Sequence, residues 1–353
     1  ADSPALVAPA CGMLGHGDVQ QTWQAAEVCA QNLLKRMSLD QKLTLLHGSS
    51  GGMGYAGYVR PVGVSSRHGA MRLTMNDGPQ GYNGYQEQLF GNATQFPDLI
   101  SIAASFDEAT AQRYSAALAD EFKIKGCNVL LGPDVEVVRA QRSGRTFESL
   151  SGEDPYLGNR LARVYVGEVR KRGIIATAKH WLNNNQETHR QQVNVEVSDR
   201  AQHEIYMQPF KGAIEAGVGA VMCSYNKVYG TYACENSKLL KELLRKDLGF
   251  KGFVVSDWGG THDAAKSAQG GLNVEMPEPK QYAQLQELVS SGVVPQATID
   301  ELASQVLSSM YAAGHFDGSF KLAWQWPPMF FRDATSDQHR AVARRTITDS
   351  AVL

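Results

Sequence analysis

The sequence lacks a strong charge of either sign and lacks long apolar runs. Its 353 residues include 34 basic and 36 acidic side chains, so the formal net charge is only −2. No basic stripe is present that could neutralise a nucleic-acid backbone, so nucleic acid is not an expected partner and a neutral substrate is favoured. No run approaches the roughly 18 consecutive apolar residues that a membrane span requires. The first residues resemble no leader peptide, so we expect any signal peptide of a secreted form to have been removed.

The sequence also lacks the residue spacings that hold metals and dinucleotides. Neither HExxH nor CxxC occurs, and the separation of His180 and His189 matches no zinc-binding pattern, so no metal is expected. The segment 52–57 has the glycine spacing of a dinucleotide fingerprint, but that fingerprint needs a strand before it and a helix after it. Here helical spacing precedes the glycines and Pro61 follows them, and 48–57 is predicted to be a loop. We therefore expect no nicotinamide, flavin or other cofactor.

Cysteine is scarce, with five in the chain, and the positions of four suggest two disulfides. One bridge would fix a turning loop after a strand, and the other would join the N-terminal arm to the first helix. These expected pairs are Cys223 with Cys234 and Cys11 with Cys29. Cys127 lies in an apolar run and is expected to be a buried, unreactive side chain. The sequon at Asn92 predicts an exposed, glycosylated loop, which together with the disulfides favours a secreted, extracellular protein.

Apolar runs that end in polar residues alternate with stretches of helical spacing. The runs expected to be strands are 72–81, 126–138, 173–181, 218–226 and 252–258. Helices are expected at 22–36, 39–46, 107–125, 158–172, 199–216 and 236–248, with two more inside 281–314. This alternation predicts an α/β fold with a parallel sheet. The number of units favours a TIM-like (β/α)8 barrel over an open doubly wound sheet, an alternative that the pattern leaves open.

The same patterns divide the chain into four parts. We expect an N-terminal arm at 1–20, a β/α barrel at 21–315, a linker at 316–335 and the truncated start of a second α/β domain at 336–353. Clustered aromatics and Pro327-Pro328 indicate the linker. The last helical run stops without a cap, so we expect the chain to end inside an element of that second domain.

Charged and aromatic residues follow the expected strands. In a barrel the C-terminal ends of the strands meet at one mouth, where loops build a concave site. The residues expected there are Asp77, Arg145, Lys179, His180, Arg190, Tyr225, Asp257 and Trp258. Singly, each could be a solvated charge, a core side chain or, for Asp257, a helix cap. Together they suit a pyranose, because its hydroxyls bind charged side chains and its C–H face stacks on an indole ring.

Six ordered motifs resemble those of glycoside hydrolase family 3, the β-glucosidases and their relatives. The motifs are DGP at 77–79, GRTFESLSGEDPYL at 144–157, KHW at 179–181, NNQE before Arg190, MCSYNKV at 222–228 and SDW at 256–258 with GLNVEMP behind it. The resemblance implies that this is the family's N-terminal barrel domain. It also implies that Asp257 is the nucleophile and that the other strand-end residues line the subsite for the non-reducing sugar. Asn83 stands where the family often has Arg, so one sugar contact is expected to be weaker.

The resemblance implies a retaining, exo-acting β-glucosidase that forms a covalent intermediate on Asp257. In the family the acid/base Glu comes from the α/β sandwich domain after the barrel, so we expect that C-terminal domain to supply it. Alternatives are a β-xylosidase, a non-catalytic carbohydrate-binding or scaffold protein, and an enzyme that forms a Schiff base on Lys179, which a polar pocket disfavours. An acid within the chain would be Glu153, Glu187 or Glu275.

Overall fold

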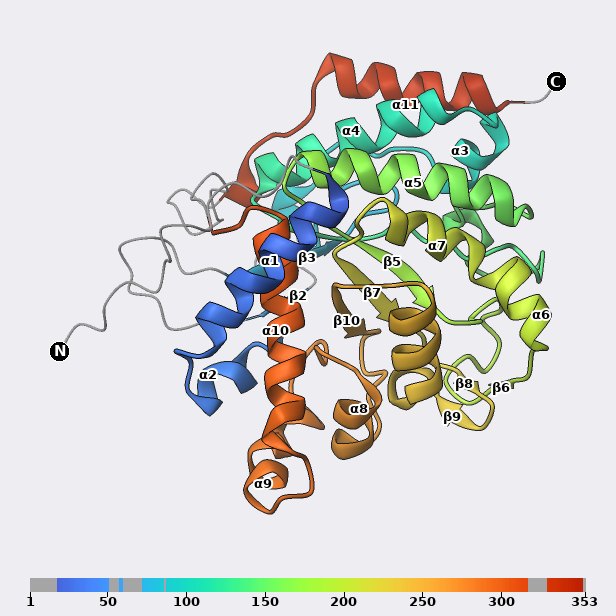
Figure 1. Ribbon diagram of the computed structural model, residues 1–353. Coiled ribbons are helices and arrows are strands. Elements are labelled where there is room, and N and C mark those ends of the chain that lie inside the picture. Colours follow the sequence, from blue (N-terminus) through green and yellow to red (C-terminus); the bar gives the residue numbers. More distant parts are fainter. Residues whose placement is uncertain (1–17, 51–56, 60–71, 86, 317–328, 352–353) are drawn as a thin grey trace.

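The computed structural model describes residues 18–50, 57–59, 72–85, 87–316 and 329–351, which form a curled sheet surrounded by helices (Figure 1). The main sheet has seven strands in the order β1-β2-β3-β4-β5-β7-β10. Their bounds are β1 Gly48–Ser50, β2 Gly57–Val59, β3 Leu73–Asp77, β4 Val129–Leu131, β5 Ile175–Trp181, β7 Ala220–Cys223 and β10 Phe253–Ser256. All five runs expected to be strands therefore contain one.

The sheet closes into a ring through one short segment. Val274 pairs in parallel with Val255 of β10, and the next residue, Glu275, pairs in parallel with His47 just before β1. The backbone N–H of Gly48 donates to the carbonyl of Glu275 at 2.7 Å. The backbone N–H of Glu275 donates to the carbonyl of Leu46 at 3.0 Å. The two edges of the sheet are thus joined, and the TIM-like α/β fold expected from the sequence is confirmed.

One part of the ring differs from the expected pattern. From β3 to β10 all neighbouring strands are parallel, but β2 runs antiparallel to both β1 and β3. The prediction that 48–57 is a loop was therefore wrong at both ends, because these short glycine-rich strands lack the apolar run on which the other strands were recognised.

Helices pack on the outer face of the ring. Their bounds are α1 Val19–Leu34, α2 Leu39–Thr44, α3 Leu99–Ser105, α4 Glu108–Lys125, α5 Pro155–Lys171, α6 Asp199–Ala201, α7 Gln208–Glu215, α8 Ala264–Gly270, α9 Leu285–Ser290, α10 Gln296–Ala312 and α11 Asp337–Ser350. Two segments expected to be regular helix, Gln202–Tyr206 and Lys238–Asp247, contain wider π-type turns instead. Local signals set several ends: Asp107 caps α4, and Gly126 ends it in the left-handed conformation.

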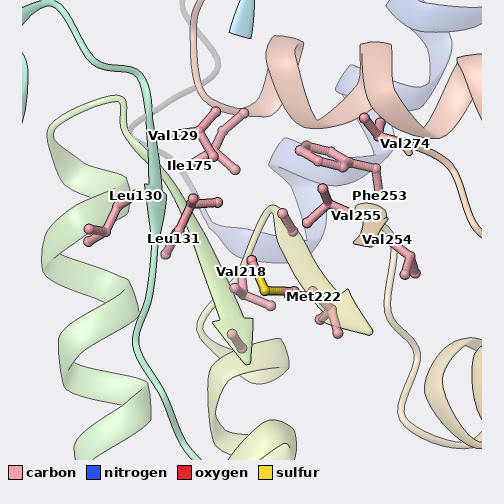
Figure 2. Packing of buried hydrophobic residues seen from close by; sticks show 14 of the residues in the cluster. Val129, Leu130, Leu131, Ile175, Val218, Met222, Phe253, Val254, Val255 and Val274 are labelled. Atoms are coloured by element: carbon pink, nitrogen blue, oxygen red, sulfur yellow. The ribbon is translucent and has the colours of Figure 1, made fainter. Parts of the chain in front are cut away.

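The core lies inside the ring and between the ring and its helices. Figure 2 shows Val129 and Leu131 on one side of β4 and Leu130 on the other, as strand geometry requires. All seven residues of β5 are buried, which is typical of a parallel strand covered on both faces. The strands therefore have little freedom to move, and they hold the residues at their ends in fixed positions.

A second, three-stranded sheet follows the C-terminal ends of β5 and β7. It is built from β6 Asn194–Val195, β8 Lys227–Val228 and β9 Thr231–Tyr232. The predicted disulfide between Cys223 and Cys234 is present at the end of β7, with a Cα–Cα distance of 5.2 Å. The predicted pairing of Cys29 involves Cys11, which lies outside the described residues. Cys127 is free and buried, as expected.

The C-terminal helix α11 lies against α3 and α4 (Figure 1). Its Asp349 accepts a hydrogen bond from Arg113 of α4 at 3.1 Å, and Nδ1 of His339 lies 2.9 Å from the buried carboxylate of Glu121. No described helix is both long and apolar enough to span a bilayer.

The sequon asparagine is held in the fold. Asn92 is half-buried, and its side-chain oxygen accepts a hydrogen bond from the Lys125 ammonium. Lys125 also donates to the carbonyls of Phe330 and Arg332. The Asn92 side chain is therefore less exposed than the sequon predicts.

Candidate active site

The parallel strands end at one edge of the ring, and the predicted site residues follow these ends. Lys179 and His180 lie near the C-terminal end of β5, Asp77 is the last residue of β3, and Asp257 directly follows β10. Arg145, Arg190 and Tyr225 lie on the loops after β4, β5 and β7. Because β3, β4, β5, β7 and β10 are all parallel, their C-terminal ends share one mouth.

Asp257 is a buried carboxylate with one unused oxygen. Its Oδ1 accepts the backbone N–H of Trp258 at 2.7 Å, whereas Oδ2 has no hydrogen-bond partner among the described residues. Burial raises the pKa of Asp257, and the Trp258 N–H, the Tyr225 hydroxyl and the cations Arg145 and Lys179 oppose that rise. A buried, unpaired carboxylate oxygen is costly unless a ligand uses it.

Two cations lie near Asp257 and share one carboxylate. Arg145 donates to both oxygens of Glu148, at 2.7 and 2.9 Å, and Lys179 Nζ lies 3.4 Å from Glu148 Oε2. Burial acts to raise the pKa of Glu148, but the hydrogen bond and charge of Arg145 and the charge of Lys179 outweigh it and hold the pKa below its ordinary value. Glu148 therefore fixes both cations in place as an ionised side chain.

Two buried carboxyls, Asp134 and Glu136, lie on the other side of His180. Nδ1 of His180 is 3.0 Å from Glu136 Oε2 and 3.5 Å from Asp134 Oδ2, and its Nε2 is 3.8 Å from Asp257 Oδ2. Burial raises the pKa of both carboxyls. The charge of Glu148 adds to the rise in pKa at Asp134, which reaches about 7, and the charge of Asp134 adds to the rise at Glu136. One donor atom from each of Asp134, Glu136 and His180 lies within 4.8 Å of the others, a spacing that a cation could use.

The remaining predicted residues form the rim. The guanidinium of Arg190 lies 4.5 Å from the centre of the Tyr225 ring and pairs with Glu187 at 2.9 Å. The Tyr225 hydroxyl donates to the carbonyl of Trp258 at 2.9 Å, and the Trp258 side chain is half-buried against the core. These contacts fix two aromatic side chains beside Asp257.

Asp77 is the most exposed of the predicted residues that end a strand. It accepts a hydrogen bond from the Tyr85 hydroxyl at 2.5 Å. Burial, and then the Asp77 charge, raise the pKa of Tyr85, so this hydroxyl remains a donor. Asn83 exchanges backbone hydrogen bonds with the side chain of Asn76, at 2.8 and 3.0 Å. These two hydrogen bonds therefore hold the loop after β3 without an arginine at position 83.

The three glutamates considered as internal acids lie in different places. Glu187 lines the hollow that also contains Arg145 and His180. Glu153 is exposed and accepts a hydrogen bond from Gln141 at 2.7 Å. Glu275 is buried in the ring-closing segment, where it accepts backbone N–H groups from Gln281 and Tyr282. Glu275 therefore has a structural task, and Glu153 lies away from the hollow.

Sequence reasoning missed Asp134, Glu136 and Glu148. The first two are the polar residues at the end of the run 126–138, so the rule that found Asp257 would have found them too. Glu148 lies within GRTFES, three residues after Arg145. Its pairing with Lys179 depends on tertiary structure.

Comparisons with known proteins agree in the family they indicate. Residues 75–309 match the family described as Glycosyl hydrolase family 3 N terminal domain. The chain is 38% identical over 291 residues to Beta-glucosidase B of Emericella nidulans, an alignment that covers 81% of this chain and 33% of that protein. The chain spans about a third to a half of the length of the curated relatives it matches.

Solved structures give the same result. The β-glucosidase D2-BGL of Chaetomella raphigera superposes with a TM-score of 0.81 at 33% identity, over 94% of this chain and 46% of that one. The β-glucosidase 3B of Thermotoga neapolitana in complex with glucose gives 0.79 at 28% identity, over 91% of this chain and 46% of that one. Both resemblances cover nearly all of the present chain.

Proposed function

The chain belongs to glycosyl hydrolase family 3, and from this membership we propose that it provides the sugar-binding barrel and the nucleophile of a retaining, exo-acting β-glucosidase. The observation that carries the proposal is Asp257. It is a buried carboxylate at the strand-end mouth, its Oδ2 has no partner among the described residues, and two cations lie near it. Relatives with this barrel include β-glucosidases, one of which is described in complex with glucose.

In the proposed first step, Asp257 Oδ2 attacks the anomeric carbon of a terminal β-glucosyl residue. A covalent bond forms between that oxygen and the sugar, and the bond from the sugar to the leaving oxygen breaks. The leaving oxygen takes a proton from a general acid, and water then releases glucose from Asp257. We propose that this acid/base lies in a C-terminal α/β domain of the same protein, because the relatives are longer than this chain by about half or more of their own length.

Sugar hydroxyls are assigned to the fixed polar residues around Asp257. Arg145, Lys179 and His180 offer donors from the interior of the mouth, and Asp77 offers an acceptor at its edge. Trp258, which directly follows the nucleophile, provides a flat surface for the C–H face of the ring. In this arrangement the sugar lies between these polar residues and the ring of Trp258, and it presents its anomeric carbon to Asp257.

The nucleophile assignment can be tested on the full-length protein with a mechanism-based 2-fluoroglucoside. The expected result is one covalent label per molecule on the peptide that contains Asp257, and no label in Asp257→Asn. Asp263→Asn is the matched control, because Asp263 caps the nearby helix α8 and pairs with Lys266 of that helix, and asparagine also caps helices well. Binding of glucose with no label on any carboxylate would favour a carbohydrate-binding protein instead.

The specificity part of the proposal separates a β-glucosidase from a β-xylosidase. We assign Asp77 and Lys179 to the O4 and O6 region of glucose, and xylose lacks the hydroxymethyl group that carries O6. Aryl β-glucoside should therefore exceed aryl β-xyloside in kcat/KM, by up to about 10⁴-fold when a buried polar group loses its partner. Equal values for the two substrates would contradict the assignment.

We also propose that the protein is exported. Support comes from the disulfide between Cys223 and Cys234, which is buried and closes a short loop. Fractionation of the source cells should recover the oxidised protein outside the cytoplasm. Recovery of a cytoplasmic form with free thiols at both positions would contradict this part.

A further inference from the structure

His180 lies between two carboxyl groups, one beside each of its ring nitrogens, and both are potential acceptors for its single N–H. Its Nδ1 is 3.0 Å from Glu136 Oε2, and its Nε2 is 3.8 Å from Asp257 Oδ2. The ring is almost completely buried. Burial and the charges of Arg145, Lys179 and Arg190 hold its pKa well below the ordinary value, so the imidazole is neutral. A neutral imidazole has one N–H and one acceptor nitrogen, so only one of the two carboxyls can face a donor.

The arrangement around Asp257 favours the proton on Nε2. If Nδ1 held it, the lone pair of Nε2 would face Asp257 Oδ2, a buried oxygen with no other partner among the described residues. Two acceptors would then face each other inside the protein without a donor between them, which is unfavourable. A proton on Nε2 instead points an N–H at the nucleophile and at any sugar hydroxyl beside it.

A proton on Nε2 requires a donor opposite Nδ1, and Glu136 is the group in position. Its other oxygen, Oε1, accepts the backbone N–H of Asn184 at 2.8 Å. A neutral carboxyl satisfies both contacts, because Oε1 accepts from Asn184 while Oε2–H donates to Nδ1. Burial and the nearby carboxyl of Asp134 raise the pKa of Glu136, and the charge of Arg145 opposes this only in part.

We propose that Glu136 is held as a neutral carboxyl that donates its proton to Nδ1 of His180, so that His180 presents an N–H at Nε2 to Asp257 and to the bound sugar. Glu136 is thus a positioning residue that acts through His180. The inference rests on the proposed function for its kinetic consequences, but the location of the proton can be measured without catalysis.

A cation shared by Asp134, Glu136 and His180 is the competing arrangement. Their donor atoms are close enough together for it. However, Nδ1 and Glu136 Oε2 are already within hydrogen-bond distance, and the positive charges of Arg145 and Lys179 act on the same group of residues. These positive charges repel a divalent ion. A single proton between Glu136 and Nδ1 of His180 also gives these two acceptors a donor, and it adds only one positive charge where the ion would add two.

Glu136→Gln in the full-length protein separates a neutral from an ionised Glu136. The glutamine amide copies a neutral carboxyl, with its oxygen toward Asn184 and its NH₂ toward Nδ1. We expect kcat/KM for an aryl β-glucoside to stay within about threefold of wild type near pH 6. We also expect the alkaline limb that ionisation of Glu136 gives the wild-type pH profile to be lost in the variant, because position 136 no longer titrates.

Glu136→Ala removes the partner of Nδ1 and should lower kcat/KM by about 10²-fold, because a misplaced site residue costs about that much. Glu153→Gln, a substitution in the same loop but outside the hollow, is the matched control and should change neither the rate nor the pH profile. If Glu136 were ionised in the wild type, its two oxygens would accept from the N–H of Asn184 and from an N–H at Nδ1. The single amide oxygen of glutamine could not accept from both. Glu136→Gln would then be impaired like Glu136→Ala, and that result would overturn the proposal.

Neutron diffraction from a deuterium-exchanged crystal of the wild-type protein provides the second measurement. Deuterium on His180 Nε2 and on Glu136 Oε2 is the expected result. Deuterium on Nδ1 with a bare Glu136 would overturn the proposal, as would a stoichiometric divalent metal at this site by elemental analysis. A protein that shows the expected deuterium positions but hydrolyses no β-glucoside would refute the proposed function and leave the positioning of His180 standing.

Discussion

Asp257 directly follows β10, and Glu275 lies in the segment that pairs with β10 and closes the ring. Both are buried carboxyls, but their oxygens have different contacts. Both oxygens of Glu275 accept backbone N–H groups, from Gln281 at 2.9 and 3.1 Å and from Tyr282 at 2.6 Å. Asp257 uses one oxygen in this way and leaves Oδ2 without a partner among the described residues. Burial raises the pKa of both groups. The satisfied carboxyl of Glu275 is suited to maintaining the fold, whereas the free oxygen of Asp257 is available to a ligand, as the proposed function requires.

The largest expected effect comes from removing the charge at Asp257. Asp257→Asn should lower kcat on an aryl β-glucoside by about 10⁴-fold or more, because asparagine is not a competent nucleophile. Stability should not fall, since the substitution removes a buried charge whose pKa burial has raised. Steady-state kinetics and urea unfolding of the same preparation would check both parts. A variant that loses stability as well as activity would show that Asp257 supports the fold, and would remove the contrast with Glu275.

The disulfide beside Asp257 should have the next largest effect. Cys223 and Cys234 are 11 positions apart, and the backbone N–H of Asp257 donates to the carbonyl of Cys223 at 3.2 Å. Replacing both cysteines by serine should cost about 3 kcal/mol of unfolding free energy by loop-closure entropy. Denaturant titration would measure the loss, with Cys127→Ser as a control for removing a buried thiol outside the bridge. An unchanged midpoint in the double variant would mean that packing alone holds the Tyr225 loop.

The contrast between the two carboxyls also shows how far the sequence could lead. The apolar run at 252–256 predicts both β10 and the position of Asp257, because a strand and its last residue are local features. The disulfide and the mouth follow from the same kind of pattern. The role of Glu275 could not be predicted, since the parallel bridge to His47 joins residues far apart in the chain and neither forms a recognisable strand.

The antiparallel β2 and the interior partners of His180 were missed for related reasons. Strand β2 has three residues and no apolar run, so its direction depends on pairing with β1 and β3. Glu136 is visible at a strand end, but its contact with His180 depends on the register between neighbouring loops. Local pattern therefore indicates which residues reach the mouth, whereas tertiary structure decides which of them face one another.

A substitution at Glu275 tests the structural half of the comparison. Glu275→Gln replaces one acceptor oxygen by an NH₂ group that faces backbone N–H donors, so we expect a loss of about 1 to 3 kcal/mol in unfolding free energy. The kcat of the folded fraction should change little, because Glu275 lies in the ring-closing segment. Urea unfolding and active-site titration would check this. A loss of kcat with unchanged stability would mean that Glu275 belongs to the chemistry after all.

The smallest expected effect is a pH dependence of stability that originates at Asp134. Burial and the charge of Glu148 raise its pKa from an ordinary value near 4 to about 7. Between these two values the folded state binds more protons than the unfolded state, so this group's contribution to stability is greatest below about pH 4 and falls as the pH rises to about 7.

Asp134→Asn removes the titration and keeps an oxygen for the backbone N–H of Glu136, which in the wild type donates to Asp134 Oδ1 at 3.0 Å. The variant should therefore gain thermal stability relative to wild type at pH 8 and show a smaller difference at pH 5. Calorimetric melting at both pH values would measure the difference, with Asp120→Asn as a control at an exposed carboxylate paired with Arg172. A difference that is the same at both pH values would show that Asp134 stays ionised in the folded protein over this range.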